Sequence, residues 1–249
     1  MMAQAALPAA VRVGCSGFVY KHWRGGVFYP DKWPARRELE YYAAQFDTVE
    51  LNNPFYHLPP RSTFEKWAAG TPDGFLFAVK ASRFITHLKR LRDAGPALET
   101  FLENARGLGR KLGPILFQFP ARWELHLERL EEFLPLLPAR LSFAFEFRHA
   151  SWFQPPVYRA LERAGAGLCL PVSPALPEPP QAATSPLVYL RMHAGRGRDG
   201  NFEPGELRLW SRRLRELLSP SSRGFVYFNN DWQGFAPKNA HRFRELLSA

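Results

Sequence analysis

The sequence predicts an α/β fold of one particular kind, a single (β/α)₈ TIM barrel. Eight short runs rich in branched and aromatic residues alternate with segments of helical periodicity, a pattern typical of βα units in a parallel sheet. Eight such strands close a barrel, and the 249 residues match the roughly 250 of a complete one. No linker or internal repeat divides the chain. We therefore expect one domain over residues 11–249, preceded by a loose tail over residues 1–10.

Short β-rich runs are the strand candidates. The expected strands are Val11–Ser16, Thr48–Asn52, Phe75–Ala81, Ile115–Phe119, Ser142–Arg148, Gly167–Val172, Leu187–His193 and Gly224–Asn230. Apolar residues at helical spacing predict helices in seven of the intervals. These helices are Ala35–Phe46, Thr63–Ala69, Ala97–Leu112, Leu125–Leu137, Val157–Ala164, Glu206–Leu218 and Asn239–Leu247.

The interval after the sixth strand differs from the others. Five residues from Pro174 to Pro186 are prolines, and proline in a helix interior removes a hydrogen bond and clashes with the preceding turn. We expect an irregular segment over residues 171–186 in place of a helix. A lid over the barrel and a degenerate helix are both compatible with this composition.

Residues alternate between the two faces of a strand, so each barrel strand presents one face to the lumen and one to the helices. In the fifth strand the outward set is Phe143, Phe145 and Phe147, and the inward set ends with Glu146 and Arg148. The other strands that end in polar inward residues contribute Glu50, Asn52, Lys80, Gln118, Arg191 and His193. Because barrel active sites lie at the C-terminal ends of the strands, this pattern predicts a polar site there.

Residue chemistry gives these side chains expected roles. Glu50 or Glu146 would be the general acid or base, with His193 as the second proton carrier, while Lys80 would stabilise negative charge. Lys80 is also a candidate Schiff-base nucleophile, although the neighbouring carboxylates are expected to keep it protonated. A buried ion network that caps the core is the structural alternative. The expected substrate-binding residues are Ser16, Tyr20, Trp23, Asn52, Tyr56, Gln118, Arg148, His149, Trp152, Arg191, Asn229, Asn230 and Asp231.

Composition and charge limit the partners. The net charge is +10 and the isoelectric point about 9.9, and cations outnumber carboxylates at the strand ends, so a small anionic or phosphorylated ligand fits. Nucleic acid stays open as a partner, although arginines spread over the outer helices also explain the charge. No apolar run approaches the roughly 20 residues of a membrane span, and two isolated cysteines suit a reduced, cytoplasmic protein. We expect no cofactor, and the sequence does not set the oligomeric state.

Eight motifs occur in an order that is shared with a known family. They are Gly14–Gly17 with Tyr20 and Trp23, Phe28–Pro30, Phe46–Asn52 with Phe55 and Tyr56, Phe77–Lys80 with Thr86 and His87, Gly113–Pro120, Glu146–His149 with Ser151 and Trp152, Tyr189–His193, and Tyr227–Asp231. Together they resemble the domain of unknown function 72, or YecE-like, family over nearly the whole chain. The resemblance implies a (β/α)₈ barrel but supplies no reaction. Phe18 stands where the family usually has tryptophan, and Val172 where an acidic residue is common, which weakens any mechanism that needs a carboxylate from the sixth strand.

Three functions fit these observations. The first is a metal-independent hydrolase or lyase that acts on a sugar-like or phosphorylated anion. The second is a metal-dependent phosphoesterase acting on nucleic acid, with Glu50, Glu146, His193 and Asp231 as ligands; the few inward histidines and aspartates count against it. The third is a binding module without chemistry for a nucleotide, a metabolite or single-stranded nucleic acid. The sequence favours the first.

Overall fold

Eight parallel strands form one sheet in the computed structural model, which describes residues 11–178, 180 and 182–248. The order around the sheet is β1-β8-β7-β6-β5-β4-β3-β2, so each strand lies beside its neighbours in the chain. The predicted (β/α)₈ barrel is therefore confirmed, while the tail expected over residues 1–10 lies outside the described residues. The strands are β1 (Val11–Cys15), β2 (Thr48–Leu51), β3 (Leu76–Lys80), β4 (Leu112–Gln118), β5 (Phe143–Glu146), β6 (Gly167–Val172), β7 (Leu187–Met192) and β8 (Arg223–Phe228).

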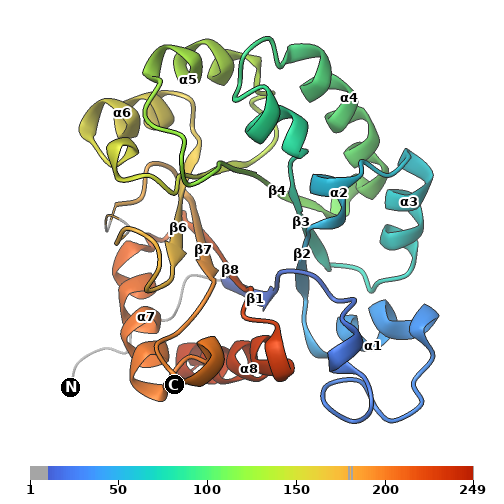
Figure 1. Ribbon diagram of the computed structural model, residues 1–249. Helices are drawn as coiled ribbons and strands as arrows, with labels where there is room; N and C mark the ends of the chain where they lie inside the picture. Colours follow the sequence, from blue (N-terminus) through green and yellow to red (C-terminus); the bar gives the residue numbers. More distant parts are fainter. Residues whose placement is uncertain (1–10, 179, 181, 249) are drawn as a thin grey trace.

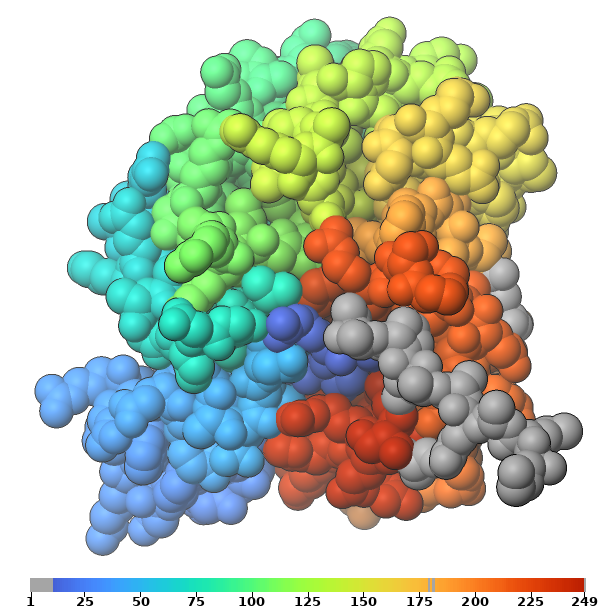
Figure 2. All heavy atoms as spheres, turned by 180° about the vertical axis from the view of Figure 1, so that it is seen from behind, coloured from blue at the N-terminus to red at the C-terminus, as the bar shows by residue number. Residues whose placement is uncertain are grey.

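Helices surround the strands and cover the outside of the barrel (Figure 1). They are α1 (Glu38–Gln45), the single-turn α2 (Asn53–Tyr56), α3 (Arg61–Ala69), α4 (Gly95–Ala105), α5 (Leu127–Phe133), α6 (Pro155–Arg163), α7 (Pro204–Leu217) and α8 (Phe235–Ser248). Seen from behind, the surface follows the chain around the molecule, and the red atoms of α8 lie next to the blue N-terminal segments (Figure 2). None of the described helices combines the length and the apolar composition that crossing a bilayer requires.

Glycine moves one predicted boundary. The helix expected over Ala97–Leu112 ends at Ala105, because a segment of 3₁₀ turns follows in which Gly109 has a left-handed backbone (φ 56°). Such a conformation is easy for glycine and unfavourable for most other residues. The strand after it, β4, accordingly begins at Leu112 and not at Ile115 as expected.

The second half of the barrel keeps the predicted alternation of strands and helices. A capping box sets the start of one helix, and prolines account for one segment without a helix. Helix α7 starts at Pro204, earlier than the expected Glu206, because Glu203 and Glu206 form a capping box around its first turn. Between β6 and β7 the described part of the segment contains no helix, as its prolines predict. The described residues of that segment pass from strand to strand as turns and irregular backbone.

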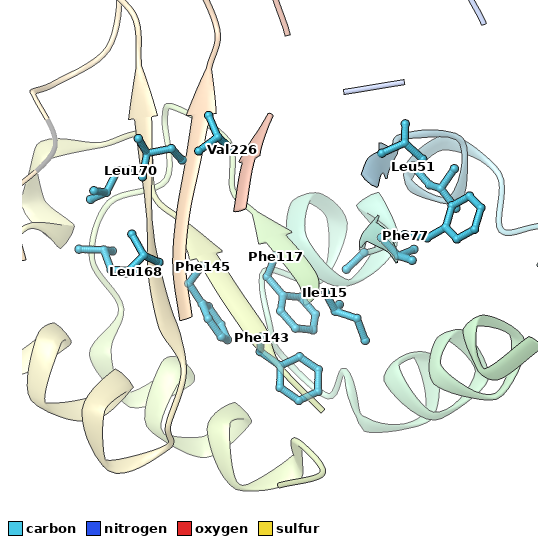
Figure 3. Packing of buried hydrophobic residues seen from close by; sticks show 14 of the residues in the cluster. Leu51, Phe77, Ile115, Phe117, Phe143, Phe145, Leu168, Leu170 and Val226 are labelled. Carbon is cyan, nitrogen blue, oxygen red and sulfur yellow. The ribbon is translucent and has the colours of Figure 1, made fainter. Parts of the chain in front are cut away.

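The core has two layers, which follow the predicted alternation of faces. The outer layer packs between strands and helices, and Figure 3 shows Phe117, Phe143 and Phe145 together on this face. Burying each such ring stabilises the fold by about 1.5–3 kcal/mol. The inner layer fills the barrel with Ala78, Leu116, Ala144, Cys169, Leu187, Tyr189, Phe225 and Tyr227. The polar side chains therefore begin where this inner layer ends, toward the C-terminal ends of the strands.

One seam of the barrel is closed by a side chain. Strands β1 and β2 share only a single bridge, between Ser16 and Glu50. Below it, the Tyr42 hydroxyl accepts a hydrogen bond from the Cys15 amide at 2.7 Å and donates one to the Thr48 carbonyl at 3.0 Å. A Cβ atom at position 14 would clash with the Thr48 carbonyl and lie 2.9 Å from the Tyr42 hydroxyl. Glycine at position 14 thus leaves the space in which the tyrosine replaces a missing ladder hydrogen bond.

We expect Tyr42→Phe to lower the free energy of unfolding by about 1–3 kcal/mol, because a buried donor and a buried acceptor lose their partner together. Urea denaturation measures this change. Tyr41→Phe is the matched control, since the Tyr41 hydroxyl has no hydrogen bond among the described residues. Equal losses in the two variants would mean that the hydroxyl does not hold the seam.

Candidate functional site

A cavity of about 1310 Å³ opens at the C-terminal ends of the strands. The loops after β1, β2, β4 and β8 form its walls, and the ends of β3, β5 and β7 contribute to its base. The lining residues are Gly17, Phe18, Val19, Tyr20, Leu51, Asn52, Asn53, Phe55, Tyr56, His57, Trp67, Lys80, His87, Gln118, Pro120, Ala121, Arg148, Arg191, Asn229 and Asp231. This position is the one that the polar strand ends predict.

A buried arginine lies between two buried glutamates beneath the cavity. Arg191 Nη2 lies 2.7 Å from Glu50 Oε1, and Arg191 Nη1 lies 2.7 Å from Glu146 Oε2. Arg191 is 1% exposed and neither glutamate is exposed at all. The guanidinium therefore joins β2 to β5 across the barrel from its place on β7.

Further donors occupy the remaining carboxylate lone pairs. Glu50 accepts hydrogen bonds from the hydroxyls of Ser16 at 2.7 Å and Tyr189 at 2.6 Å. Glu146 accepts one from Arg148 Nε at 2.6 Å. We call Glu50, Glu146, Arg148, Arg191 and His193 the charged cluster.

Both carboxylates of the charged cluster are ionised. Burial by itself raises the pKa of Glu50, but Arg191 and the donated hydrogen bonds outweigh it and the net pKa is lowered. For Glu146 burial again acts to raise the pKa, and Arg191, His193 and Arg148 together bring it well below the usual value. Two carboxylates that are ionised, buried and saturated with donors are poorly placed to exchange protons with a substrate.

His193 is neutral in this surrounding. Its Nε2 lies 3.1 Å from Glu146 Oε1, and its Nδ1 lies 3.1 Å from the side-chain amide of Asn229. Arg148 Nη2 and Arg191 Nη1 each lie 3.3 Å from the same Nε2, so the ring is surrounded by charged groups. Burial lowers the pKa of His193, and the opposing effect of Glu146 is offset by Arg191 and Arg148.

Lys80 differs from the other charged residues of the site because it has no counterion. Its side chain lines the cavity and is 8% exposed. Its Nζ sits 3.8 Å from the centre of the Phe55 ring, and no described carboxylate lies within ion-pair distance. Burial lowers the pKa of Lys80 to about 7, with help from Arg191 and against Glu146 and Glu50. Both carboxylates are already paired with arginine, so burial outweighs their effect on the Lys80 pKa, and the protonation state expected for this amine stays a prediction.

The other predicted residues divide into three groups. Ser16 belongs to the base of the site, under the cavity. Those that line the cavity wall are Tyr20, Asn52, Tyr56, Gln118, Arg148, Asn229 and Asp231. The Oδ1 atom of Asn52 is buried without a hydrogen-bond partner among the described residues.

Four predicted residues lie away from the cavity lining. The Trp23 indole is buried and donates to the Asp231 carbonyl at 2.7 Å. Trp152 stacks on Phe147 in the outer core, with ring centres 4.2 Å apart. His149 caps a short 3₁₀ turn, and Asn230 donates to the Gly200 carbonyl at 3.2 Å. These contacts order the loops around the site.

A metal site does not form from the residues that the second hypothesis requires. Glu50 and Glu146 both point at Arg191, whose guanidinium occupies the place of a cation between them. Asp231 pairs instead with His22, at 3.3 Å. Within the described residues, no group of three or more His, Cys, Asp and Glu side chains is arranged to hold a metal ion.

Three residues that shape the site were given no role in it from the sequence. Tyr189 lies on the inner face of β7 two residues before Arg191, so strand alternation was sufficient to find it. Phe55 and His87 lie in loops, and their rings meet with centres 5.0 Å apart. No periodic signal predicts which loop side chains turn toward a cavity.

Fold and site together define a class of protein, the (β/α)₈ barrels that carry a charged, cavity-lining centre at the C-terminal ends of their strands. The chain belongs to the family described as "Protein of unknown function DUF72", whose profile matches residues 12–249. The resemblance seen in the sequence motifs is thus confirmed.

Two kinds of relative support this membership. The UPF0759 protein YunF of Bacillus subtilis is 28% identical over 253 residues, which cover 88% of this chain and 89% of the relative. The crystal structure of a DUF72 family protein from Thermotoga maritima has a TM-score of 0.86 and 30% identity, and the match covers 96% of this chain and 100% of that one. A DUF72 family protein from Enterococcus faecalis has a TM-score of 0.80 at 21% identity, with 96% of each chain covered, and supports the fold alone.

Val172, where the family commonly has an acidic residue, does not face the charged cluster. Val172 packs in the outer core with Leu168 and Leu170, while Cys169 belongs to the inner layer. Position 172 therefore faces the helices, and a carboxylate there would not be directed at the lumen.

We expect Arg191→Met to destabilise the fold by about 3–5 kcal/mol at pH 7, because two buried carboxylates lose their shared counterion. In the native protein the lowered carboxyl pKa values give stability that is present above pH 4–5 and lost as the pH falls through the folded values. In the variant the buried carboxyls have raised pKa values, so stability should increase from pH 7 to pH 5. Urea denaturation at both pH values tests this change of sign, with the exposed Arg163→Met as control. A variant that weakens in acid like the native protein contradicts the arrangement.

We expect Lys80→Met to stabilise the protein by about 2–4 kcal/mol at pH 7. A lysine whose pKa is lower in the folded than in the unfolded chain binds its proton more weakly after folding. The resulting loss of folding stability is complete below pH 7 and decreases toward pH 10. The gain in melting temperature should therefore shrink as the pH rises from 7 to 10. The exposed Lys66→Met should show no such trend, and a Lys80→Met gain independent of pH would contradict the lowered pKa.

Proposed function

We propose that the protein is a metal-independent enzyme of lyase type, which binds a small anionic carbonyl compound in the cavity and reacts with it through the Lys80 amine. The observation that carries this proposal is the placement of that amine. It lines a large cavity, it is almost fully buried, and it has neither a counterion nor a hydrogen-bond partner among the described residues.

A reactive lysine needs a neutral nitrogen at neutral pH. With its pKa lowered to about 7, about half of the Lys80 amine is neutral at pH 7, against roughly one part in a thousand or less for an ordinary lysine. Desolvation against Phe55 and the nearby guanidinium of Arg191 is the usual means of activating a nucleophilic lysine. A neutral amine adds to a carbonyl carbon, and the adduct takes up a proton from solvent in the open cavity and loses water to give an iminium. The iminium accepts the electron pair when a neighbouring C–C or C–H bond breaks, and the proton that this cleavage releases returns to solvent.

The charged cluster takes a positioning role in this scheme. Glu50 and Glu146 hold Arg191 in place and do not exchange protons, which differs from the acid–base roles that the sequence favours for them. Arg148 lines the cavity with its side chain 26% exposed, while its Nε is held by Glu146. Its guanidinium, whose Nη2 lies 3.3 Å from His193 Nε2, makes the inner end of the cavity positive, which favours a carboxylate or phosphate on the substrate.

The cavity walls suit a polyhydroxylated substrate. The Asn52 and Gln118 side chains supply amide groups, and Tyr56, Phe55 and Tyr20 supply aromatic surface. Aromatic faces with a few convergent polar groups are typical of small-molecule sites. This composition favours a sugar-like carbon chain over a purely apolar ligand.

The proposal is tested by trapping the iminium. The protein is incubated at pH 7 with pyruvate or with acetone, which share a methyl ketone but differ in charge, and each sample is reduced with borohydride. Peptide mass spectrometry should find the adduct on Lys80 ahead of the exposed Lys66 and Lys238, and more with pyruvate than with acetone. Lys80→Met should lose this adduct. Labelling of Lys80 no faster than that of the exposed lysines would refute the proposal.

A further inference from the structure

We propose that the substrate also carries a phosphate group, which is held in a second, basic pocket that adjoins the cavity at His87. This proposal rests on the proposed function in one respect only, namely that the carbonyl end of the substrate reacts with Lys80. The basic pocket has a volume of about 580 Å³ and is lined by His87, Leu88, Lys89, Arg90, Arg92 and Arg129.

The basic pocket lies next to the reacting amine along a chain of contacts. His87 lines both hollows. Its ring packs against Phe55, with centres 5.0 Å apart, and Lys80 Nζ is 3.8 Å from the centre of that same Phe55 ring. One small molecule bound over His87 and Phe55 therefore has its two ends near Lys80 and the basic pocket.

The charges of the basic pocket are uncompensated. Lys89, Arg90, Arg92 and Arg129 form no ion pair with any described carboxylate, although Asp93 is adjacent in the chain. Elsewhere on the surface arginines do pair, for example Arg61 with Glu103 at 2.7 Å. Cations gathered without acids repel one another, so an anion between them is stabilising.

The ring of His87 is neutral beside these cations. Burial lowers its pKa to about 4, and Lys80, Arg148, Arg83 and Arg90 act in the same direction. Its Nδ1 lies 2.9 Å from the Thr86 hydroxyl. A neutral imidazole adds no further charge and can bond to a ligand that spans the two hollows.

The backbone of this loop is strained in a way that presents the arginines. Arg90, Leu91 and Asp93 have φ values of 47°, 68° and 44°, a region that costs residues other than glycine about 1 kcal/mol or more each. Leu91 is buried and its amide donates to the Ile85 carbonyl at 3.1 Å. This anchor leaves Arg90 and Arg92 exposed on either side of it.

The chemistry of the lining favours phosphate over other anions. A guanidinium group can donate two parallel hydrogen bonds to two oxygens of one phosphate. Several cationic side chains around one pocket also match the double negative charge of a phosphate group. The loop after β7, where barrel phosphate sites often occur, is less suitable because the Arg196 amide is taken by Glu206 at 3.0 Å. The structure thus favours the loop after β3 as the phosphate subsite.

The test compares dihydroxyacetone phosphate with dihydroxyacetone in the borohydride trapping experiment. The phosphorylated ketone should label Lys80 about tenfold or more faster, the value of one or two charged hydrogen bonds. Arg90→Gln with Arg92→Gln should remove this preference. Arg159→Gln with Arg212→Gln, which removes the same charge from exposed positions on α6 and α7, should keep it, and the preference for pyruvate over acetone should persist in both double variants.

Binding of inorganic pyrophosphate separates this proposal from the previous one. A thermal shift that the Arg90 and Arg92 variant loses supports the basic pocket even if no ketone labels Lys80. Equal labelling by the two ketones together with no pyrophosphate shift would overturn the phosphate subsite and leave Lys80 as the reacting group. A shift given by a single-stranded oligonucleotide and not by pyrophosphate, and lost in the same variant, would also overturn it and assign the surface to nucleic acid.

Discussion

The ion pairs that the Arg191 guanidinium forms with two buried glutamates are the interaction on which the site depends. Glu50 and Glu146 come from strands on different sides of the barrel. Arg191, on a third strand, places one guanidinium nitrogen 2.7 Å from a carboxylate oxygen of each. Two carboxylates this close would otherwise raise each other's pKa and one would take up a proton. With the guanidinium between them both remain charged, and the strand ends keep one fixed arrangement.

The same contact determines the state of Lys80. Arg191 and Arg148 already balance the two carboxylates, so Lys80 has no counterion and burial lowers its pKa to about 7. In the function that we propose, the unfavourable surroundings of this amine are a local loss of stability that would serve reactivity. The charge balance of the cluster and the lowered pKa of the lysine have the same electrostatic origin.

The sequence predicted the barrel and the members of the charged cluster because strand alternation is strict. Once Phe143 and Phe145 were placed outward, Glu146 had to face the lumen. What could not be predicted depends on distances between strands: that Arg191, and not Lys80, is the partner of Glu146, and hence that the Lys80 amine has no counterion. The packing of Trp152 on Phe147 and the left-handed backbone at Leu91 also lay beyond the sequence, because aromatic residues and loops carry no periodicity that fixes their direction.

The seam at Tyr42 affects the order in which the barrel can be completed. Strand β1 pairs along its whole length with β8 and shares only one bridge with β2. Most of the β1 backbone therefore has no strand partner until β8, the last strand of the barrel in sequence order, packs beside it. Contacts between the two ends of a chain are slow to form. Until β8 has packed against it, β1 is an unpaired strand edge, and such edges are prone to aggregation.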